Sequence, residues 1–189
     1  MMDKEEMVPL KDAMEQVDTT VRRLALLHLG FSRALVKEYG VEKGKEMIVK
    51  SMVEYGKLVW EQAKKGHQDL PFYGFHDKYV FGDEECIDIR QGPASRGEGV
   101  DYSQFKVYGC GLAKTFSEFD EEALGRLHCY TDAAKSMAAD PDQKLIHREC
   151  VLCEDGFCSF DLIPTSEKEK EDFINNAADW KEVDPILKG

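Results

Sequence analysis

The chain has 189 residues, of which 42% are hydrophobic and 33% charged, a composition typical of a globular domain with its own core. Asp and Glu outnumber Lys and Arg by 37 to 25, which gives a formal net charge of -12. A surface this acidic repels phosphate backbones and anionic lipid head groups, and no block of Lys and Arg reverses the sign. We therefore expect neither nucleic acid nor a membrane as a partner.

The N-terminal residues favour a cytoplasmic protein. Residues 1–6 are charged and lack the apolar stretch of a signal peptide. The longest apolar cluster, residues 24–29, contains His28 and is far too short to cross a bilayer. Without an export signal, the six cysteines are expected to be free thiols, metal ligands or nucleophiles rather than a disulfide framework.

The first third of the chain predicts two long helices. Apolar residues recur every three or four positions over residues 12–39 and again over residues 41–65. Gly40 and Gly66 follow these segments, and glycine is the usual residue of left-handed helix C-caps. The short connection implies an antiparallel helical hairpin over residues 1–66. Two long amphipathic helices must bury their apolar faces. We expect these faces to lie mainly in the core of the domain, and a homodimer through the N-terminal helices is the alternative.

The remaining residues, 67–189, are expected to complete a single domain with short strands and further helices. Ser166 and Glu169 form the sequence pattern of a capping box at the start of the last helix. The predicted fold class is α+β, with the long N-terminal helical hairpin packed on a small antiparallel sheet and additional C-terminal helices. The expected elements are an aromatic loop over 69–83, a strand over 85–90, a glycine-rich loop over 91–99, a strand over 105–112, a helix over 118–137 bent near Gly125, and a helix over 167–180.

The clearest β signal is a hairpin over residues 144–163. Asp155-Gly156 lies between its two strands, and this dipeptide is typical of a two-residue type I′ turn. Such a turn would place Cys153 opposite Cys158, where a shared metal, a redox disulfide or simple core packing would suit the short separation. Because side chains alternate between the faces of a sheet, Cys150 would lie on the opposite face. We therefore do not expect the hairpin alone to supply three thiolate ligands.

A second group of reactive side chains lies on the helix before the hairpin. Cys129 and Asp132 are three residues apart and share one helix face. They could act as a nucleophile and its base, or bind a metal together with His128 or a residue from the sheet, or be a buried thiol with a structural carboxylate. On the hairpin, His147 and Glu149 form a polar pair on the face expected to point inward.

Four short sequence motifs between residues 105 and 162 resemble those of a known protein family. They are a strand ending in Cys110, the helical motif Cys129-Tyr130-Thr131-Asp132, the pair Asp140-Pro141, and a hairpin closing on Cys158-Ser159-Phe160-Asp161. In these motifs the chain resembles the L-2-amino-thiazoline-4-carboxylic acid hydrolase family. The additional thiols Cys150 and Cys153 depart from the family pattern.

The resemblance implies a small-molecule substrate and hydrolysis of a non-peptide carbon–nitrogen bond in a cyclic amidine such as a carboxylated thiazoline. Cys129, or a water activated by Asp132, would attack the ring carbon between sulfur and nitrogen. His128 or His147 would protonate the leaving atom. The residues expected to bind the substrate are Arg126, Arg148, Cys110 and Asp161.

A different class of protein also fits the hairpin. Its ending, Cys158-Ser159-Phe160, resembles the 4-vinyl reductase type of non-catalytic small-molecule or metal-binding sensor domain. In that interpretation Cys153 and Cys158 would bind a divalent metal, whereas the hydrolase would need no cofactor. The metal content of the protein discriminates between the two hypotheses.

Overall fold

The computed structural model describes residues 8–67, 106–107 and 109–188. The predicted aromatic loop, the strand over 85–90 and the glycine-rich loop lie outside the described residues. None of the helices in the described part of the chain combines the length and apolar character that crossing a membrane requires.

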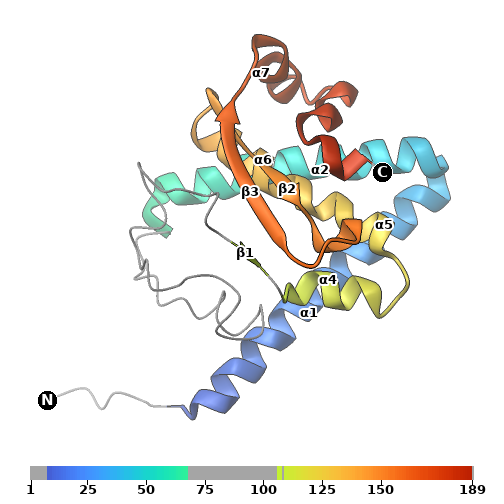
Figure 1. Cartoon of the computed structure of the whole chain (residues 1–189), viewed down its shortest axis with the longest axis vertical. Coiled ribbons are helices and arrows are strands. Elements are labelled where there is room, and N and C mark those ends of the chain that lie inside the picture. The colour runs from blue at the N-terminus through green and yellow to red at the C-terminus, as the bar shows by residue number, and fades with distance from the viewer. Residues whose placement is uncertain (1–7, 68–105, 108, 189) are drawn as a thin grey trace, which may run out of the picture.

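Two long helices form the N-terminal hairpin, as the sequence predicts. They are α1 (Leu10–Tyr39) and α2 (Val41–Gln62), and a π-helical turn, η1 (Ala63–His67), follows α2. Gly40 joins the helices with φ 79° and ψ 168°, so φ is positive as predicted but ψ is extended rather than left-handed helical. A Cβ on Gly44 would lie 2.6 Å from Val36 Cα, so the helices touch just after the turn. From there they diverge (Figure 1).

Helix α6 (Tyr130–Ala139) lies between α2 and the sheet, and it forms the middle layer of the molecule (Figure 1). Gly56 of α2 makes the helix contact possible, because a Cβ there would lie 2.6 Å from the carbonyl carbon of Ala134. Tyr130, Ala133 and Met137 of α6 are all buried in the core. This packing fixes the start of α6, where Cys129 is located, against the strands.

The sheet has three antiparallel strands in the order β1-β3-β2. Strand β1 is Lys106–Val107, β2 is Gln143–Glu149 and β3 is Cys158–Pro164. His147 pairs with Phe160, and the register then shifts so that Glu149 pairs with Ser159. Long N-terminal helices, a small antiparallel sheet and C-terminal helices confirm the predicted α+β fold class.

The connection between β2 and β3 is longer than the predicted two-residue turn. Val151–Cys153 forms a 3-10 turn, η5, and Glu154 adopts φ 72°. The Asp155 carboxylate accepts a hydrogen bond from the backbone N–H of Cys150 at 2.8 Å, so it closes this wider loop instead of occupying a type I′ turn. The predicted pairing of Cys153 with Cys158 is therefore wrong, since β2 ends at Glu149, before Cys153, and Cys158 pairs with Val107 of β1.

Two other elements also differ from the prediction. Of the strand expected over 105–112, the structure describes only residues 106–107 as strand. Cys110 instead caps a short helix, α4 (Gly111–Ser117), and its Sγ accepts a hydrogen bond from the backbone N–H of Ala113 at 3.5 Å. The helix expected over 118–137 breaks near Gly125, as predicted. It divides into α5 (Glu122–Gly125), the 3-10 turn η4 (Arg126–Cys129) and α6.

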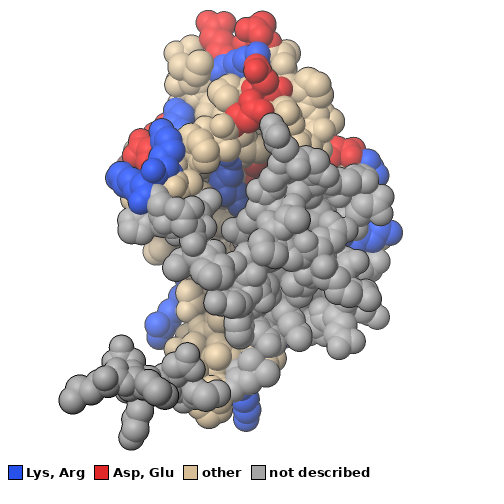
Figure 2. Space-filling view, turned by 90° about the vertical axis from the view of Figure 1, so that its left-hand side faces the viewer, with Lys and Arg blue, Asp and Glu red and all other residues tan. Residues whose placement is uncertain are grey.

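The C-terminal segment crosses back over the body of the domain. Helix α7 (Glu167–Ile174) begins with the predicted capping box of Ser166 and Glu169, but it ends earlier than residue 180. The 3-10 turns η6 (Ala178–Val183) and η7 (Pro185–Lys188) follow. Asp and Glu side chains gather with lysines at the end of the molecule where α7 lies (Figure 2). The turn between η6 and η7 buries Asp184 beside β2.

Candidate metal centre

Cysteines from separate segments meet where the start of α6 faces the β2–β3 connection. Cys129 ends η4, Cys150 follows β2, and Cys158 begins β3. The thiols of Cys129 and Cys158 both lie close enough to Cys150 to shift the pKa of its thiol. All three are free thiols, and Cys150 is fully buried. Cys150 therefore lies at the centre of the cluster, although the sequence placed it on the opposite face of the hairpin.

His147 completes the cluster. One ring nitrogen of His147 and the sulfur atoms of Cys129 and Cys150 all lie within 4.8 Å of one another. The imidazole is only 3% exposed and packs against the Phe160 ring, with 4.8 Å between the ring centroids. A buried imidazole beside two buried thiols is a set of ligand types that suits zinc and other borderline-soft cations.

Asp184 fixes the orientation of His147. Its Oδ2 accepts the backbone N–H of His147 at 2.9 Å and also lies 2.9 Å from the ring Nδ1. Because an ionised carboxylate only accepts hydrogen bonds, Nδ1 carries the proton and Nε2 has a free lone pair. Nε2 lies 3.5 Å from Oδ2 of Asp132. Metal-binding histidines in proteins commonly have this arrangement, with a carboxylate on the opposite ring nitrogen.

Hydrogen bonding concentrates negative charge on Cys150. The Cys129 and Cys158 thiols donate to its sulfur, which lowers the pKa of Cys150 although burial opposes the shift, and nearby His147 lowers it further. The same hydrogen bonds, together with burial, raise the pKa of Cys129 and Cys158. Burial alone would lower the pKa of His147, but the hydrogen bond to Asp184 and the charge of Asp132 outweigh it and raise the pKa.

The structure also brings Asp132 to this cluster. Its two carboxylate oxygens contact different side chains: Oδ1 lies 3.1 Å from Lys135 Nζ, and Oδ2 faces His147. Burial raises the pKa of Asp132, but Lys135 and His147 together outweigh burial and lower it, which keeps the group ionised. Cys110 lies close enough for Asp132 and Cys150 to contribute to its raised pKa, although burial is the main cause.

Three predicted site residues have other partners. His128 faces away into a cavity between α1 and α2, where its ring centroid is 5.0 Å from that of His28, and burial lowers its pKa to about 3. The guanidinium of Arg148 pairs with both carboxylate oxygens of Asp161. These two residues, both expected to bind substrate, thus contact each other.

The remaining predicted residues lie at the edge of the cluster. Arg126 Nη1 donates to Cys153 Sγ at 3.8 Å, and the Cys153 thiol donates to the carbonyl of Ile186 at 3.4 Å. Cys153 also contacts Cys150 through a thiol hydrogen bond. Its sulfur is therefore engaged mainly by a guanidinium and a backbone carbonyl, unlike that of Cys158.

Sequence reasoning missed Cys150 and Asp184. Cys150 was assigned to the wrong face because the alternation rule assumed that β2 continues to the turn. Asp184 lies 37 residues after His147 with no motif around it, so no sequence signal connects the two residues. No known protein family, no curated protein and no solved structure matches the chain. The geometry of the cluster is thus the basis for assigning a function.

Proposed function

We propose that the chain is a metal-binding domain in which Cys129, His147 and Cys150 hold a divalent cation, with zinc as the best-suited ion. The observation that carries the proposal is the convergence of two sulfur atoms and one imidazole nitrogen within 4.8 Å. In a tetrahedral zinc site with Zn–S bonds of about 2.3 Å, two sulfur ligands lie about 3.8 Å apart. Small side-chain adjustments would therefore bring the three ligand atoms to coordination distance.

Cys158 is the fourth ligand in this proposal. Its thiol lies against Cys150, and its Sγ accepts the backbone N–H of Val151 at 3.3 Å, which partly opposes the rise that Cys150 and burial cause in the pKa of Cys158. The resulting Cys3His set is a closed coordination sphere, and such spheres are typical of structural zinc. Compared with the metal ligands expected from the sequence, Cys158 stays in the set, Cys153 leaves it, and Cys129, His147 and Cys150 join it.

The bound ion would connect segments that are distant in sequence. Cys129 belongs to the helical layer, His147 and Cys150 to the end of β2, and Cys158 to the start of β3. Asp184 adds the C-terminal segment through His147. Because such a site does not exist in the unfolded chain, metal binding would contribute directly to folding stability. This role agrees with a non-catalytic, metal-binding sensor type of domain.

Cobalt substitution tests the coordination directly. Apo protein prepared under reducing conditions would be titrated with Co²⁺, and we expect the intense visible bands of tetrahedral thiolate coordination to saturate at one ion per chain. Cys150→Ser should weaken these bands strongly, whereas Cys153→Ser should leave them unchanged. Weak octahedral bands in the wild type, or equal spectra for the two variants, would contradict the proposal.

A second candidate function is the hydrolysis of a small cyclic amidine, and one specific observation favours it. Cys150, His147 and Asp184 lie in the order thiol, imidazole and carboxylate, which is the arrangement of a nucleophile, a base and the acid that orients it. In this candidate Cys150, rather than Cys129, attacks the ring carbon. The Cys150 proton would pass to the free Nε2 of His147 and from there to the ring nitrogen or sulfur as its bond to the attacked carbon breaks. Water would then attack the carbon held on Cys150, which releases the opened product and restores the thiol.

The two candidates make opposite predictions for metal-free protein, since a zinc-bound thiolate is not free to attack. Opening of 2-amino-thiazoline-4-carboxylate would be assayed on apo and metal-loaded protein. The hydrolase candidate expects turnover by the apo form that Cys150→Ser abolishes and that Cys129→Ser and Asp132→Asn reduce. Absence of turnover in both forms would exclude this substrate and leave the metal-binding proposal intact.

A further inference from the structure

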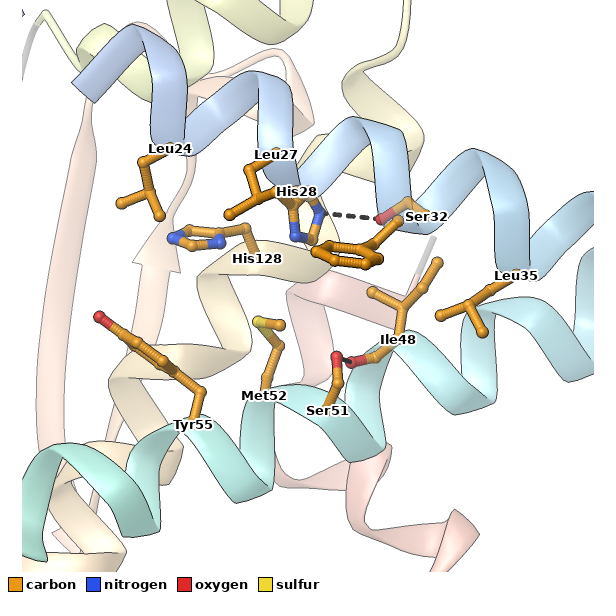
Figure 3. Close-up of a pocket in the computed structure, with 11 residues that line it drawn as sticks. Leu24, Leu27, His28, Ser32, Leu35, Ile48, Ser51, Met52, Tyr55 and His128 are labelled. Carbon is orange, nitrogen blue, oxygen red and sulfur yellow. Dashed lines mark hydrogen bonds between the residues drawn. The ribbon is translucent and has the colours of Figure 1, made fainter. Parts of the chain in front are cut away.

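A cavity of about 440 Å³ lies between the diverging helices α1 and α2. Figure 3 shows the two helices close together on the side of Leu35 and farther apart at Leu24 and Tyr55. His128 of η4 reaches into the cavity from behind. The residues that line it are Leu24, Leu27, His28, Phe31, Ser32, Leu35, Ile48, Ser51, Met52, Tyr55 and His128, and no cysteine is among them.

The walls of the cavity are apolar and uncharged. Among the residues that the structure describes, no Asp, Glu, Lys or Arg lines it, although one third of the chain is charged. Leu27 is 57% exposed and Leu24 is 40% exposed, so large hydrophobic side chains remain at its mouth. A charged ligand entering such a cavity would lose its hydration without gaining an opposite charge from the described lining residues, which is unfavourable.

The few polar groups of the cavity are already partly engaged and carry no charge. His28 donates from Nε2 to the carbonyl of Leu124 at 2.9 Å, with Ser32 Oγ 3.4 Å from the same nitrogen. Burial lowers the pKa of His28, so its ring is neutral at physiological pH. Nδ1 of His128 is shielded from solvent and has no hydrogen-bond partner among the described residues. The two imidazoles and the hydroxyl groups of Ser32, Ser51 and Tyr55 therefore supply the polar character of the cavity.

We propose that this cavity binds a compact, uncharged and mostly apolar small molecule, of the size of one or two rings. Its volume falls within the range of about 300–1,000 Å³ found for small-molecule sites, which are likewise mainly apolar with a few polar groups. This inference goes beyond the metal site and does not depend on it, because the two sites share no residue.

The shape of the cavity favours a small molecule over a helix from a partner. A helix with its side chains is about 10–12 Å wide and needs a groove that is open at both ends. Here the contact of Gly44 with Val36 closes the end near the connection. The ring of His128 forms the floor (Figure 3). The space is thus a wedge with one wide end.

Binding of a neutral fluorescent probe, N-phenyl-1-naphthylamine, tests the proposal on the whole chain. We expect saturable binding of one probe per chain, and at least tenfold weaker binding by Leu27→Glu, which places a carboxylate in the mouth. Leu26→Glu is the matched control: Leu26 is 39% exposed on the same helix but does not line the cavity, so its probe affinity should equal that of the wild type. Thermal unfolding of both variants would verify that each is folded.

Several results would overturn the proposal. One is the absence of saturable binding, or equal weakening by the two glutamate variants. Another is a dimer in which a second copy of the chain fills the cavity. In that case light scattering would find a dimer that Leu27→Glu, but not Leu26→Glu, converts to a monomer, and the wild type would bind no probe. An anionic analogue of the probe should bind more weakly than the neutral one, and stronger binding would contradict the uncharged ligand class.

Discussion

Asp184 holds His147 by two atoms at once, since its Oδ2 lies 2.9 Å from both the backbone nitrogen and the ring Nδ1. The two residues come from η6–η7 and β2 and are almost completely buried. A single carboxylate oxygen thus fixes both the position and the tautomer of the imidazole that faces the thiols. Asp184 is a positioning residue, because it acts on the proposed metal through His147.

Replacing Asp184 by Asn should weaken metal binding while keeping the shape of the side chain. We expect a loss of about 10- to 100-fold in affinity, the range found when the outer carboxylate partner of a metal-bound histidine is removed. Competition titrations with a chromophoric zinc chelator would measure it. Asp179→Asn is the control, because Asp179 is exposed and pairs with Lys168. Equal affinities for the two variants would show that Asp184 does not support the site.

Gly56 should tolerate no side chain, because its Cα approaches Ala134 too closely. Gly56→Ala would place a methyl group 2.6 Å from the backbone of α6, and overpacking of this kind costs about 1–3 kcal/mol. Gly30→Ala provides the opposite control: a Cβ there meets nothing within 4 Å, and the change should stabilise α1 by about 0.4–1 kcal/mol. Urea unfolding would compare the two variants, and a stable Gly56→Ala protein would contradict the packing of α2 on α6.

His28 should make the protein less stable in mild acid. Burial lowers its pKa in the folded state, so below the unfolded pKa of about 6.5 the unfolded chain binds a proton that the native state does not. Stability is therefore present above that pH and falls as the pH decreases, by up to about 1.4 kcal/mol per pH unit. Urea unfolding of apo protein between pH 7.5 and 5 should show a smaller decrease for His28→Gln.

Ser32→Ala is the matched control for this pH effect, because it removes the neighbouring hydroxyl but leaves the imidazole in place. It should keep the wild-type dependence on pH. If His28→Gln and the wild type lost the same stability on acidification, His28 would not be buried as a neutral ring.

The helical hairpin and the capping box of α7 could be predicted from the sequence because local rules determine them. Apolar spacing located α1 and α2, Gly40 located their connection, and the spacing of Ser166 and Glu169 located the start of α7. The β2–β3 connection could not be predicted in the same way. The Asp155 carboxylate accepts a hydrogen bond from the backbone N–H of Cys150 instead of occupying a two-residue turn. The Asp-Gly dipeptide alone does not show which of these two arrangements forms.

Local spacing in the sequence also predicted part of the candidate site. Cys129, Asp132, His147 and Cys158 were named from local spacing, and the structure brings them together. The predicted position of Cys150 depended on the strand register. The predicted sheet face was wrong because β2 ends at Glu149. Contacts that connect distant segments, such as His147 with Asp184, leave no pattern in a single sequence.

The central claim is that Cys129, His147, Cys150 and Cys158 bind one metal ion, and elemental analysis of the purified chain tests it most directly. Protein prepared with a thiol reductant and supplied with zinc would be dialysed against metal-free buffer and its zinc and protein contents measured. We predict one zinc per chain for the wild type and for Cys153→Ser, and much less than one for Cys150→Ser. Zinc-free wild-type protein whose Cys129, Cys150 and Cys158 thiols all react with a thiol reagent would contradict the account.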